Sequence, residues 1–376
     1  MRSTRCSKKI AKAVSRRGLP WFLAFLFFLA STSAQETTLR SRSNLVLVPT
    51  LVKDAQAGIV YGLQAGDFVI EDDGVEQPIR LDDAPEGQPV SIVVAIQRGR
   101  RASYEFTRML GLKTMLSPLF ASGTSRAAIV EFDSHVDLIR DFTQDEALID
   151  ADLSNLQPGD NGAAILDAVS YSVNLLRNEP EDRQRVLLLI SETRDHGSRV
   201  KVDEVVSAVG QANTLMHALA FSPGLSNILD TGRGTNKDEM HQGVNFLDLA
   251  YRAAQAMRKN VPSTVTSMTG GEYELFTTRK KFDRRMTDFT NHLHSRYLLS
   301  FAPKDPHPGL HQLRVRLKDP SKGIVLARTT YWAEAASKNE SDRACMSSAV
   351  LGMQPGWAPG CNTSGALPEV ETRLHF

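Results

Sequence analysis

The feature that most constrains this chain is an alternation of strand-like and helix-like segments between Val90 and His292. Five short apolar segments are candidate strands, at 91–97, 126–132, 186–191, 215–222 and 271–277. Several are continuous apolar runs, which is typical of strands covered on both faces. Amphipathic stretches with helical spacing separate them, at 104–117, 164–177, 201–213, 246–259 and 280–295. This order predicts an α/β fold with a doubly wound, mostly parallel sheet.

Both flanks of this region carry β-segments. Residues 44–53 alternate in polarity, and 62–81 contain a hairpin whose turn is Asp73-Gly74, a pair suited to positive φ angles. Three further strands are expected at 296–303, 311–318 and 323–333. Because two strands alone are marginally stable, we expect the N-terminal β-segment (40–88) to pair with the C-terminal one (293–334) into a small β-sandwich. The α/β domain (89–292) is then an insertion between them.

The two ends of the chain have biased compositions. Residues 1–34 combine a basic stretch, a short apolar run and small residues ending at Ala34, which predicts a secretory signal peptide; the alternative is an uncleaved anchor. Residues 335–376 lack periodicity and are expected to be a disordered tail. The chain is therefore expected to be exported, to the periplasm or the cell exterior, with membrane contact only through the export signal.

Cleavage changes the charge and the cysteine count. The whole chain has 44 Lys+Arg and 43 Asp+Glu, and loss of the seven basic residues of the leader leaves 37 against 43, a net charge of −6. Neither balance suits a nucleic-acid partner. Cys6 is lost with the leader, so Cys345 and Cys361 remain. In an oxidising compartment they could form a disulfide, or they could stay as free thiols.

Ligands of doubly wound sheets bind at the carboxyl ends of the strands, so the residues that follow each strand are the candidate site. Gln97-Arg98-Gly99-Arg100-Arg101 follows the first strand of the domain, and Ser191-Glu192-Thr193-Arg194-Asp195 follows the strand at 186–191. Gly159-Asp160-Asn161-Gly162-Ala163 precedes the helix at 164–177. These three loops are expected to meet at one edge.

With these loops in place, the chain resembles the von Willebrand factor type A domain, most closely the acidobacterial proteins related to it. The resemblance covers 44–333 and rests on PVSIVVAI (89–96), GAAILDAV (162–169) and RVLLLISETRDHGSR (185–199), with DFVIEDDG (67–74), RYLLSFAP (296–303) and the TYW ending at Trp332 as flanks. It implies an adhesion-type domain. Family members with a working site hold a divalent cation through Asp-x-Ser-x-Ser, a Thr and an Asp, and leave one position open for a partner's carboxylate.

The family's ligand positions are occupied here by Gln97, Gly99, Arg101, Ala163 and Glu192. Only Glu192 is a hard anionic ligand, so the resemblance implies a degenerate site, and we expect no metal cofactor. The clustered arginines suggest direct recognition of carboxylates or phosphates on a partner. The expected partner-binding residues are Arg98, Arg100, Arg101, Arg194, Glu192 and Asp195. The alternative is that Glu192, Asp195 and Asp160 pair with these arginines within the chain.

The leading hypothesis is an exported, non-enzymatic interaction module that recognises a protein or a surface polymer without metal. The alternative is a cation-dependent adhesin whose Mg²⁺ is held by Glu192, Asp160 and Gln97. A hydrolase is the third hypothesis, although Ser191 lacks the glycines of a nucleophile elbow. Four histidines are weaker candidates for metal ligands. His292 and His294 close an amphipathic helix, where cations are favoured anyway, whereas His307 and His311 flank a Pro-Gly turn and are expected at the surface.

Overall fold

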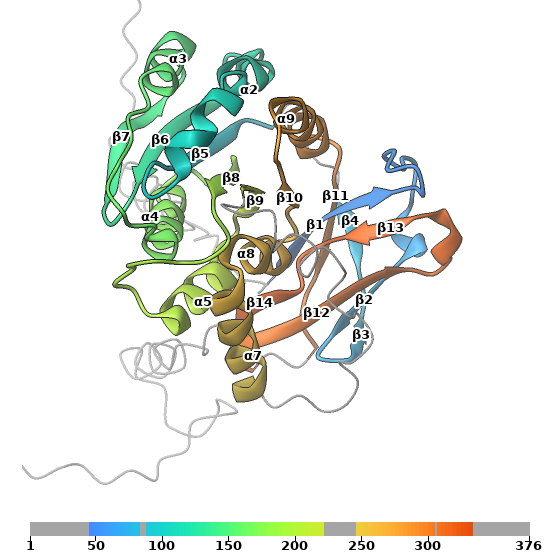
Figure 1. Cartoon of the computed structure of the whole chain (residues 1–376). Coiled ribbons are helices and arrows are strands. Elements are labelled where there is room, and N and C mark those ends of the chain that lie inside the picture. Colours follow the sequence, from blue (N-terminus) through green and yellow to red (C-terminus); the bar gives the residue numbers. More distant parts are fainter. Residues whose placement is uncertain (1–44, 83–87, 222–245, 305–306, 334–376) are drawn as a thin grey trace, which may run out of the picture. The chain divides into compact units, whose positions relative to one another are not determined.

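The structure is a computed structural model, and it describes residues 45–82, 88–221, 246–304 and 307–333 (Figure 1). Several predictions lie outside these residues: the signal peptide at 1–34, the tail at 335–376 with Cys345 and Cys361, and the polar loop at 223–245. No helix in the described part of the chain has both the length and the apolar character needed to cross a membrane.

A six-stranded sheet forms the centre of the α/β domain, with the strand order β10-β9-β8-β5-β6-β7. Its strands are β5 (Val90–Gln97), β6 (Arg126–Phe132), β7 (Val136–Thr143), β8 (Gln184–Ser191), β9 (Leu215–Ala220) and β10 (Tyr273–Leu275). All neighbouring pairs are parallel except β6 and β7. The predicted α/β class with a mostly parallel sheet is confirmed, and the antiparallel edge strand β7 was not predicted.

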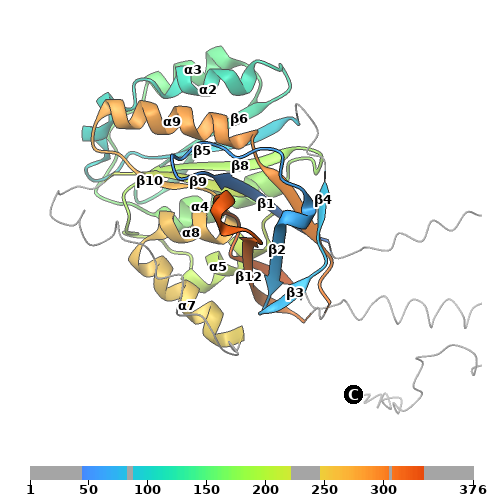
Figure 2. The same ribbon diagram turned by 90° about the vertical axis from the view of Figure 1, so that its right-hand side faces the viewer.

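Helices cover both faces of this sheet (Figure 2). One face carries α2 (Leu112–Phe120), α3 (Glu146–Ser154) and α9 (Arg279–Leu293), and the other carries α4 (Ile165–Arg177), α5 (Val202–Gln211), α7 (Phe246–Lys259) and α8 (Val261–Thr269). Side chains of β5 divide between the faces as the pleat requires. Ile92, Val94 and Ile96 belong to the first apolar cluster, and Val93 and Ala95 to the second. Burial on both faces explains the continuous apolar runs.

One helical prediction was wrong in detail, and one helix was not predicted. The helix expected at 104–117 is a 3₁₀ segment at Ala102–Arg108 followed by α2. The helix α8 was missed, although Asn260 caps it by accepting from the amide of Ser263. Pro262 lies in its first turn, where the absent amide hydrogen costs nothing.

Strands from the two flanks of the domain pair directly with one another. One antiparallel sheet has the order β13-β1-β11-β4 and the other has β14-β12-β2-β3. The strands are β1 (Val46–Lys53), β2 (Phe68–Asp72), β3 (Val75–Gln77), β4 (Arg80–Asp82), β11 (Tyr297–Phe301), β12 (Gly309–Leu317), β13 (Ile324–Leu326) and β14 (Thr330–Ala333). Apolar side chains of both sheets form one buried cluster. The segment predicted as one strand at 323–333 is divided into β13 and β14, one in each sheet.

The predicted hairpin turn joins β2 to β3. Asp73 and Gly74 have φ angles of 47° and 84°, which is the left-handed region that this turn type requires. Leu310 of β12 and Trp332 of β14 also belong to the second apolar cluster of the α/β domain, or pack against it. The antiparallel sheets therefore contact the domain through continuous apolar packing.

Candidate functional site

The candidate site lies where β5 and β8 end side by side. From β5 the chain crosses to β6 on one side, and from β8 it crosses to β9 on the other. This divergence makes the carboxyl ends of β5 and β8 the switch point of the sheet, where open α/β folds bind ligands. The loops after Gln97 and after Ser191 therefore meet there, as predicted.

Gln97 and Glu192 form a closed pair at this point. The Gln97 side chain is fully buried; its Nε2 donates to Glu192 Oε1 at 2.8 Å, and its Oε1 accepts from the Glu192 amide at 2.8 Å. Glu192 is 4% exposed. An isolated buried carboxylate is costly, so this one requires a compensating positive charge.

Arg100 supplies that charge. Its Nε lies 2.8 Å from Glu192 Oε1, and about one third of its side chain is exposed. The backbone reaches this position through a left-handed φ of 56° at Arg100, whose amide donates to the Asp160 carbonyl at 2.7 Å. The guanidinium thus neutralises the carboxylate from within the chain while one edge of it faces solvent.

Arg98 turns away from Glu192 toward β6 and β7. Its Nε lies 2.9 Å from Asp133, and its other nitrogens contact Glu131 and Asp137. Burial raises the pKa of Glu131, although Arg98 opposes the shift. Arg98 is therefore engaged in an internal charge cluster. Pairing of the arginines within the chain was one of the two expectations, but with Glu192, Asp195 and Asp160 as the acids.

At Gly99 neighbouring parts of the chain occupy the space that a side chain would need. A Cβ atom at Gly99 would lie 2.0 Å from the Gly162 carbonyl oxygen and 2.8 Å from Asp133 Cβ. Ala163 is fully buried and forms a two-bond bridge with His196, with both N···O distances at 2.8 Å. The loop before α4 is therefore packed directly onto the loop after β5.

Asp160 and Asp195 support loops. The Asp160 carboxylate accepts from the amides of Ser134 and Gly162 and from the Ser134 hydroxyl. These hydrogen bonds lower the pKa of Asp160, with Ser134 as the largest cause. Asp195 Oδ1 accepts from the Leu166 amide in the first turn of α4 at 3.0 Å. The structure thus brings Gln97 and Glu192 together and directs the Asp160 carboxylate to Ser134.

A second acidic group adjoins the site. Asp133, His135 and Asp160 offer ligand atoms within 4.8 Å of one another. Both Asp133 oxygens already accept hydrogen bonds, Oδ1 from the His135 amide and Oδ2 from Arg98 and the Asp160 amide. The internal hydrogen bonds of this group account for its geometry.

Three basic side chains remain at the surface of this edge. Arg100, Arg101 and Arg194 are exposed, and Arg101 is the N-cap of the 3₁₀ segment that carries Tyr104. The Tyr104 side chain is 74% exposed. Tyr104 was not predicted as a site residue, because an aromatic residue within an expected amphipathic helix is normally assigned to the buried face of that helix. We call Arg100, Arg101, Arg194 and Tyr104 the arginine face.

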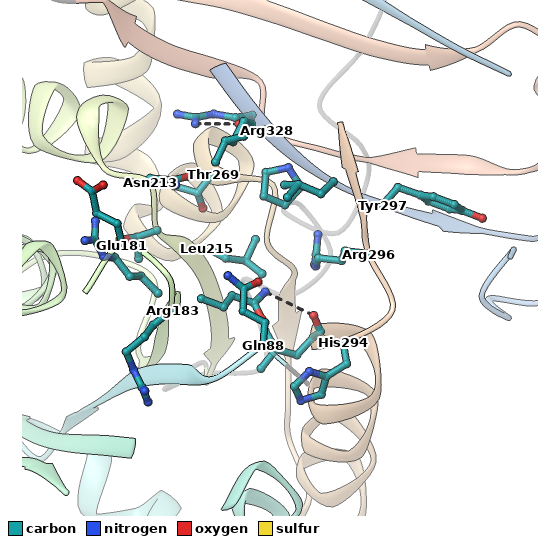
Figure 3. Close-up of a pocket in the computed structure, with 17 residues that line it drawn as sticks. Gln88, Glu181, Arg183, Asn213, Leu215, Thr269, His294, Arg296, Tyr297 and Arg328 are labelled. Carbon is teal, nitrogen blue, oxygen red and sulfur yellow. Dashed lines mark hydrogen bonds between the residues drawn. The ribbon is translucent and has the colours of Figure 1, made fainter. Parts of the chain in front are cut away.

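A hollow lies at the opposite ends of the strands, where β8 and β9 begin (Figure 3). Its volume is about 220 Å³, and its lining includes Arg183, Arg296 and Arg328. The Arg328 guanidinium donates to three carbonyls, of Leu47, Gly210 and Thr330, and so joins the antiparallel sheets to α5. Burial lowers the pKa of Arg296 and of Arg328 to about 10, so both remain cations at neutral pH. Arg328 therefore holds the antiparallel sheets against α5.

A buried charge cluster lies between β1, β9, β10 and the end of α9. Glu272 forms an ion pair with Lys53, and its Oε2 lies 2.8 Å from His292 Nδ1. Burial alone would raise the pKa of Glu272, but His292, His217 and Lys53 hold it well below its usual range. His292 therefore has a structural partner in this cluster.

No protein-family model matches the chain, and no curated protein does. Solved structures that resemble it at low identity include the following three. BatB from Bacteroides thetaiotaomicron is 13% identical over 54% of this chain and 99% of its own, with a TM-score of 0.35. Proximal thread matrix protein 1 from the mussel byssus is 13% identical over 64% of this chain and 51% of its own, at 0.37. The chain thus aligns with about half of that protein.

The third is the von Willebrand factor domain of the pilus tip protein Mfa5 from Porphyromonas gingivalis. It is 9% identical over 55% of this chain and 95% of its own, with a TM-score of 0.35. Likeness at this level carries no information about what this chain binds. The strand order and the contacts described above are therefore the basis for the function proposed below.

Proposed function

We propose that the chain is an exported, non-enzymatic interaction module that binds an acidic partner through the arginine face, without a bridging metal ion. The observation that carries the proposal is the Arg100–Glu192 pair at the switch point of the sheet. A guanidinium already compensates the one anionic residue at the family's ligand positions. A divalent cation would have to displace it from a buried carboxylate.

The chemistry of the arginine face favours an anionic partner. Guanidinium groups bind carboxylates, phosphates and sulfates through paired hydrogen bonds. Arginine and tyrosine are also the residues that most often dominate protein interfaces. Arg101 and Arg194 follow adjacent strands and lie outside the buried Gln97–Glu192 pair. They are the residues on which we expect recognition to depend.

Two further observations support the non-enzymatic part and the architecture. Ser191, the one candidate nucleophile of the sequence analysis, is fully buried and donates to the Glu192 carbonyl at 2.8 Å. The apolar cluster shared by the two antiparallel sheets supports a β-sandwich that carries the α/β domain. We further propose that this domain is of the von Willebrand factor A type with a degenerate cation site.

A capture experiment tests the proposal. The immobilised chain without residues 1–34 is incubated with the envelope fraction of its source organism, once with Mg²⁺ and once with EDTA. We expect the same acidic protein or polymer to be retained in both, and to be lost with Arg101→Glu/Arg194→Glu. The matched control is Arg314→Glu/Arg316→Glu, which reverses two exposed charges on β12 and should retain the partner. Equal recovery by both double variants would overturn the proposal.

Calorimetry addresses the alternative, a cation-dependent adhesin. One observation favours the cation-dependent adhesin: Gln97 and Glu192, which both carry side-chain oxygens, lie side by side at the switch point. Micromolar binding of Mg²⁺, Mn²⁺ or Ca²⁺ that disappears in Glu192→Gln would support a metal at this position. Loss of partner capture in EDTA would support it as well.

A further inference from the structure

A separate cluster of histidines and aspartates lies in the antiparallel sheets, at the tip of the β2–β3 hairpin. Asp73 belongs to the hairpin turn, His311 lies on β12 opposite Tyr331 of β14, and His307 precedes β12. The expectation that His311 is a surface residue was wrong, because its side chain is 1% exposed. A buried imidazole beside two carboxylates is the feature that requires an explanation.

The His311 ring is held in one orientation. Its Nε2 donates to the His307 carbonyl at 2.7 Å, and the ring stacks between those of His307 and Tyr331, with centroids 4.1 and 4.6 Å away. The other nitrogen, Nδ1, is buried and faces the carboxylates of Asp72 and Asp73, although these contacts lack the geometry of a hydrogen bond. Metal-bound histidines typically donate one ring N–H to a backbone carbonyl, as His311 does, and bind the metal through the second nitrogen, which in His311 points at carboxylates.

The two carboxylates are oriented in the same way, each through one oxygen. Asp73 Oδ1 accepts from the Gln312 amide at 2.9 Å, and Asp72 Oδ2 accepts from the Tyr331 hydroxyl at 2.9 Å. Their second oxygens converge on His311 Nδ1, Asp73 Oδ2 at 2.8 Å and Asp72 Oδ1 at 3.3 Å. Asp72 Oδ1 is buried and has no hydrogen-bond partner among the described residues.

We propose that Asp73, His307 and His311 bind a divalent transition metal of the zinc type. Their ligand atoms all lie within 4.8 Å of one another, with His307 Nε2 3.5 Å from Asp73 Oδ2. In a tetrahedral zinc site the ligand atoms are about 3.3 Å apart. Because a metal lies in the plane of each imidazole that binds it, the exposed His307 ring must rotate out of its stack on His311 to complete the geometry. Two imidazoles and a carboxylate suit zinc, copper or nickel and disfavour magnesium and calcium.

The exposure of the site provides both an entry path and an open coordination position. The side chains of His307 and Asp73 are 49% and 36% exposed, so the metal would reach His311 from solvent. Three protein ligands leave a fourth position for water or for a group of a partner. Asp72 lies outside this set and stabilises the bound charge. The metal would fasten the β2–β3 hairpin to the start of β12.

A proton on His311 Nδ1 competes with the metal for the position between the imidazole and the carboxylates. Burial would lower the pKa of His311, but Asp72 and Asp73 raise it to about 10, so a metal-free site holds an imidazolium between carboxylates. That ion pair does not require the His307 imidazole, because His307 contributes to it only through its backbone carbonyl. Substitution of His307 therefore distinguishes the two explanations: it should weaken metal binding and leave the ion pair in place.

Zinc titration of the chain from residue 35 onward tests the proposal. The background is Cys345→Ser/Cys361→Ser, which removes thiols that would bind zinc elsewhere. After treatment with EDTA and its removal, ZnCl₂ is titrated calorimetrically, and thermal unfolding is recorded with and without zinc. We expect one site with a micromolar or lower Kd, a Tm raised by several degrees, and no response to MgCl₂.

The variants use exposed residues whose loss does not disturb the core. His307→Ala and Asp73→Asn, which keeps a residue tolerant of the left-handed turn, should each weaken zinc binding by about 100-fold and abolish the Tm shift. His135→Ala, which changes the other acidic group, should bind zinc as the parent does. Absence of micromolar zinc binding in the parent, or unchanged binding in His307→Ala, would overturn the proposal. Loss of zinc binding in His135→Ala with retention in His307→Ala would overturn it too.

Discussion

The buried imidazole of His217 should control how the protein responds to mild acid. His217 lies on β9 and is 3% exposed; its Nδ1 accepts from the Glu272 amide at 3.3 Å, and its ring contacts the edge of Phe289. Burial, assisted by the nearby Arg296 cation, lowers the pKa of His217 from 6.5 to about 3. The folded protein therefore keeps this ring neutral at pH values where the unfolded chain protonates it.

The sign and size of the effect follow from linkage. Below pH 6.5 the unfolded chain binds a proton that the folded protein excludes until about pH 3, so the free energy of unfolding falls as the pH falls. The loss approaches about 1.4 kcal/mol per pH unit. Between pH 6.5 and pH 4.5 it amounts to about 2 kcal/mol for this one residue. The depressed pKa of Glu272 adds a loss at still lower pH.

Guanidinium chloride unfolding at pH 6.5, 5.5 and 4.5 measures the effect. His217→Asn retains an acceptor for the Glu272 amide and cannot titrate, so its unfolding free energy should depend less on pH, by about 2 kcal/mol over this range. His196→Asn changes an exposed histidine and should follow the parent. A parallel pH dependence in the parent and in His217→Asn would refute the reasoning.

Three substitutions test individual contacts of the fold, and the effect of each is measured by denaturant unfolding at pH 7. Gly99→Ser places a Cβ 2.0 Å from the Gly162 carbonyl and should lower the free energy of unfolding by about 2–3 kcal/mol. Its control is Gly66→Ser, where the added Cβ meets open space and the free energy of unfolding should change by less than about 0.5 kcal/mol. Arg328→Met leaves three carbonyls without their donor and should cost about 3 kcal/mol. Asn260→Ala removes the cap of α8 and should cost about 1 kcal/mol. Unchanged midpoints for Gly99→Ser or Arg328→Met would contradict the contacts described.

The parts of the fold with strong periodicity could be predicted from the sequence. Continuous apolar strands and amphipathic helices gave the parallel sheet, because burial on two faces leaves little room for polar residues. The edge strand β7 was missed because it is half exposed and carries Asp137, Arg140 and Asp141. The helix α8 was missed because a proline usually indicates the end of a helix, whereas Pro262 lies in the first turn of this one.

The site could be placed from the sequence, but its pairings could not. Positions that follow strands are fixed by topology, so Gln97 and Glu192 were expected to adjoin. The partners of Arg98 depend on β7, which contributes Asp137, and that strand was not predicted. The cluster at His311 joins residues more than 230 positions apart. The sequence predicts that the two flanking β-segments pair, but it does not specify which strand of one lies beside which strand of the other.

The pairing of β1 with β11 and of β2 with β12 has a consequence for how the protein folds. Before the α/β domain forms, these pairings close loops of more than two hundred residues, and they form slowly. Once the domain is folded, Gln184 at the start of β8 contacts both Pro89 at its entrance and Leu293 near its exit. The two ends of the folded domain are then already close together, so the loop that the β1–β11 and β2–β12 pairings must close is short. The antiparallel sheets should therefore form last, and a defect in the central domain would leave their edges exposed to aggregation during biosynthesis.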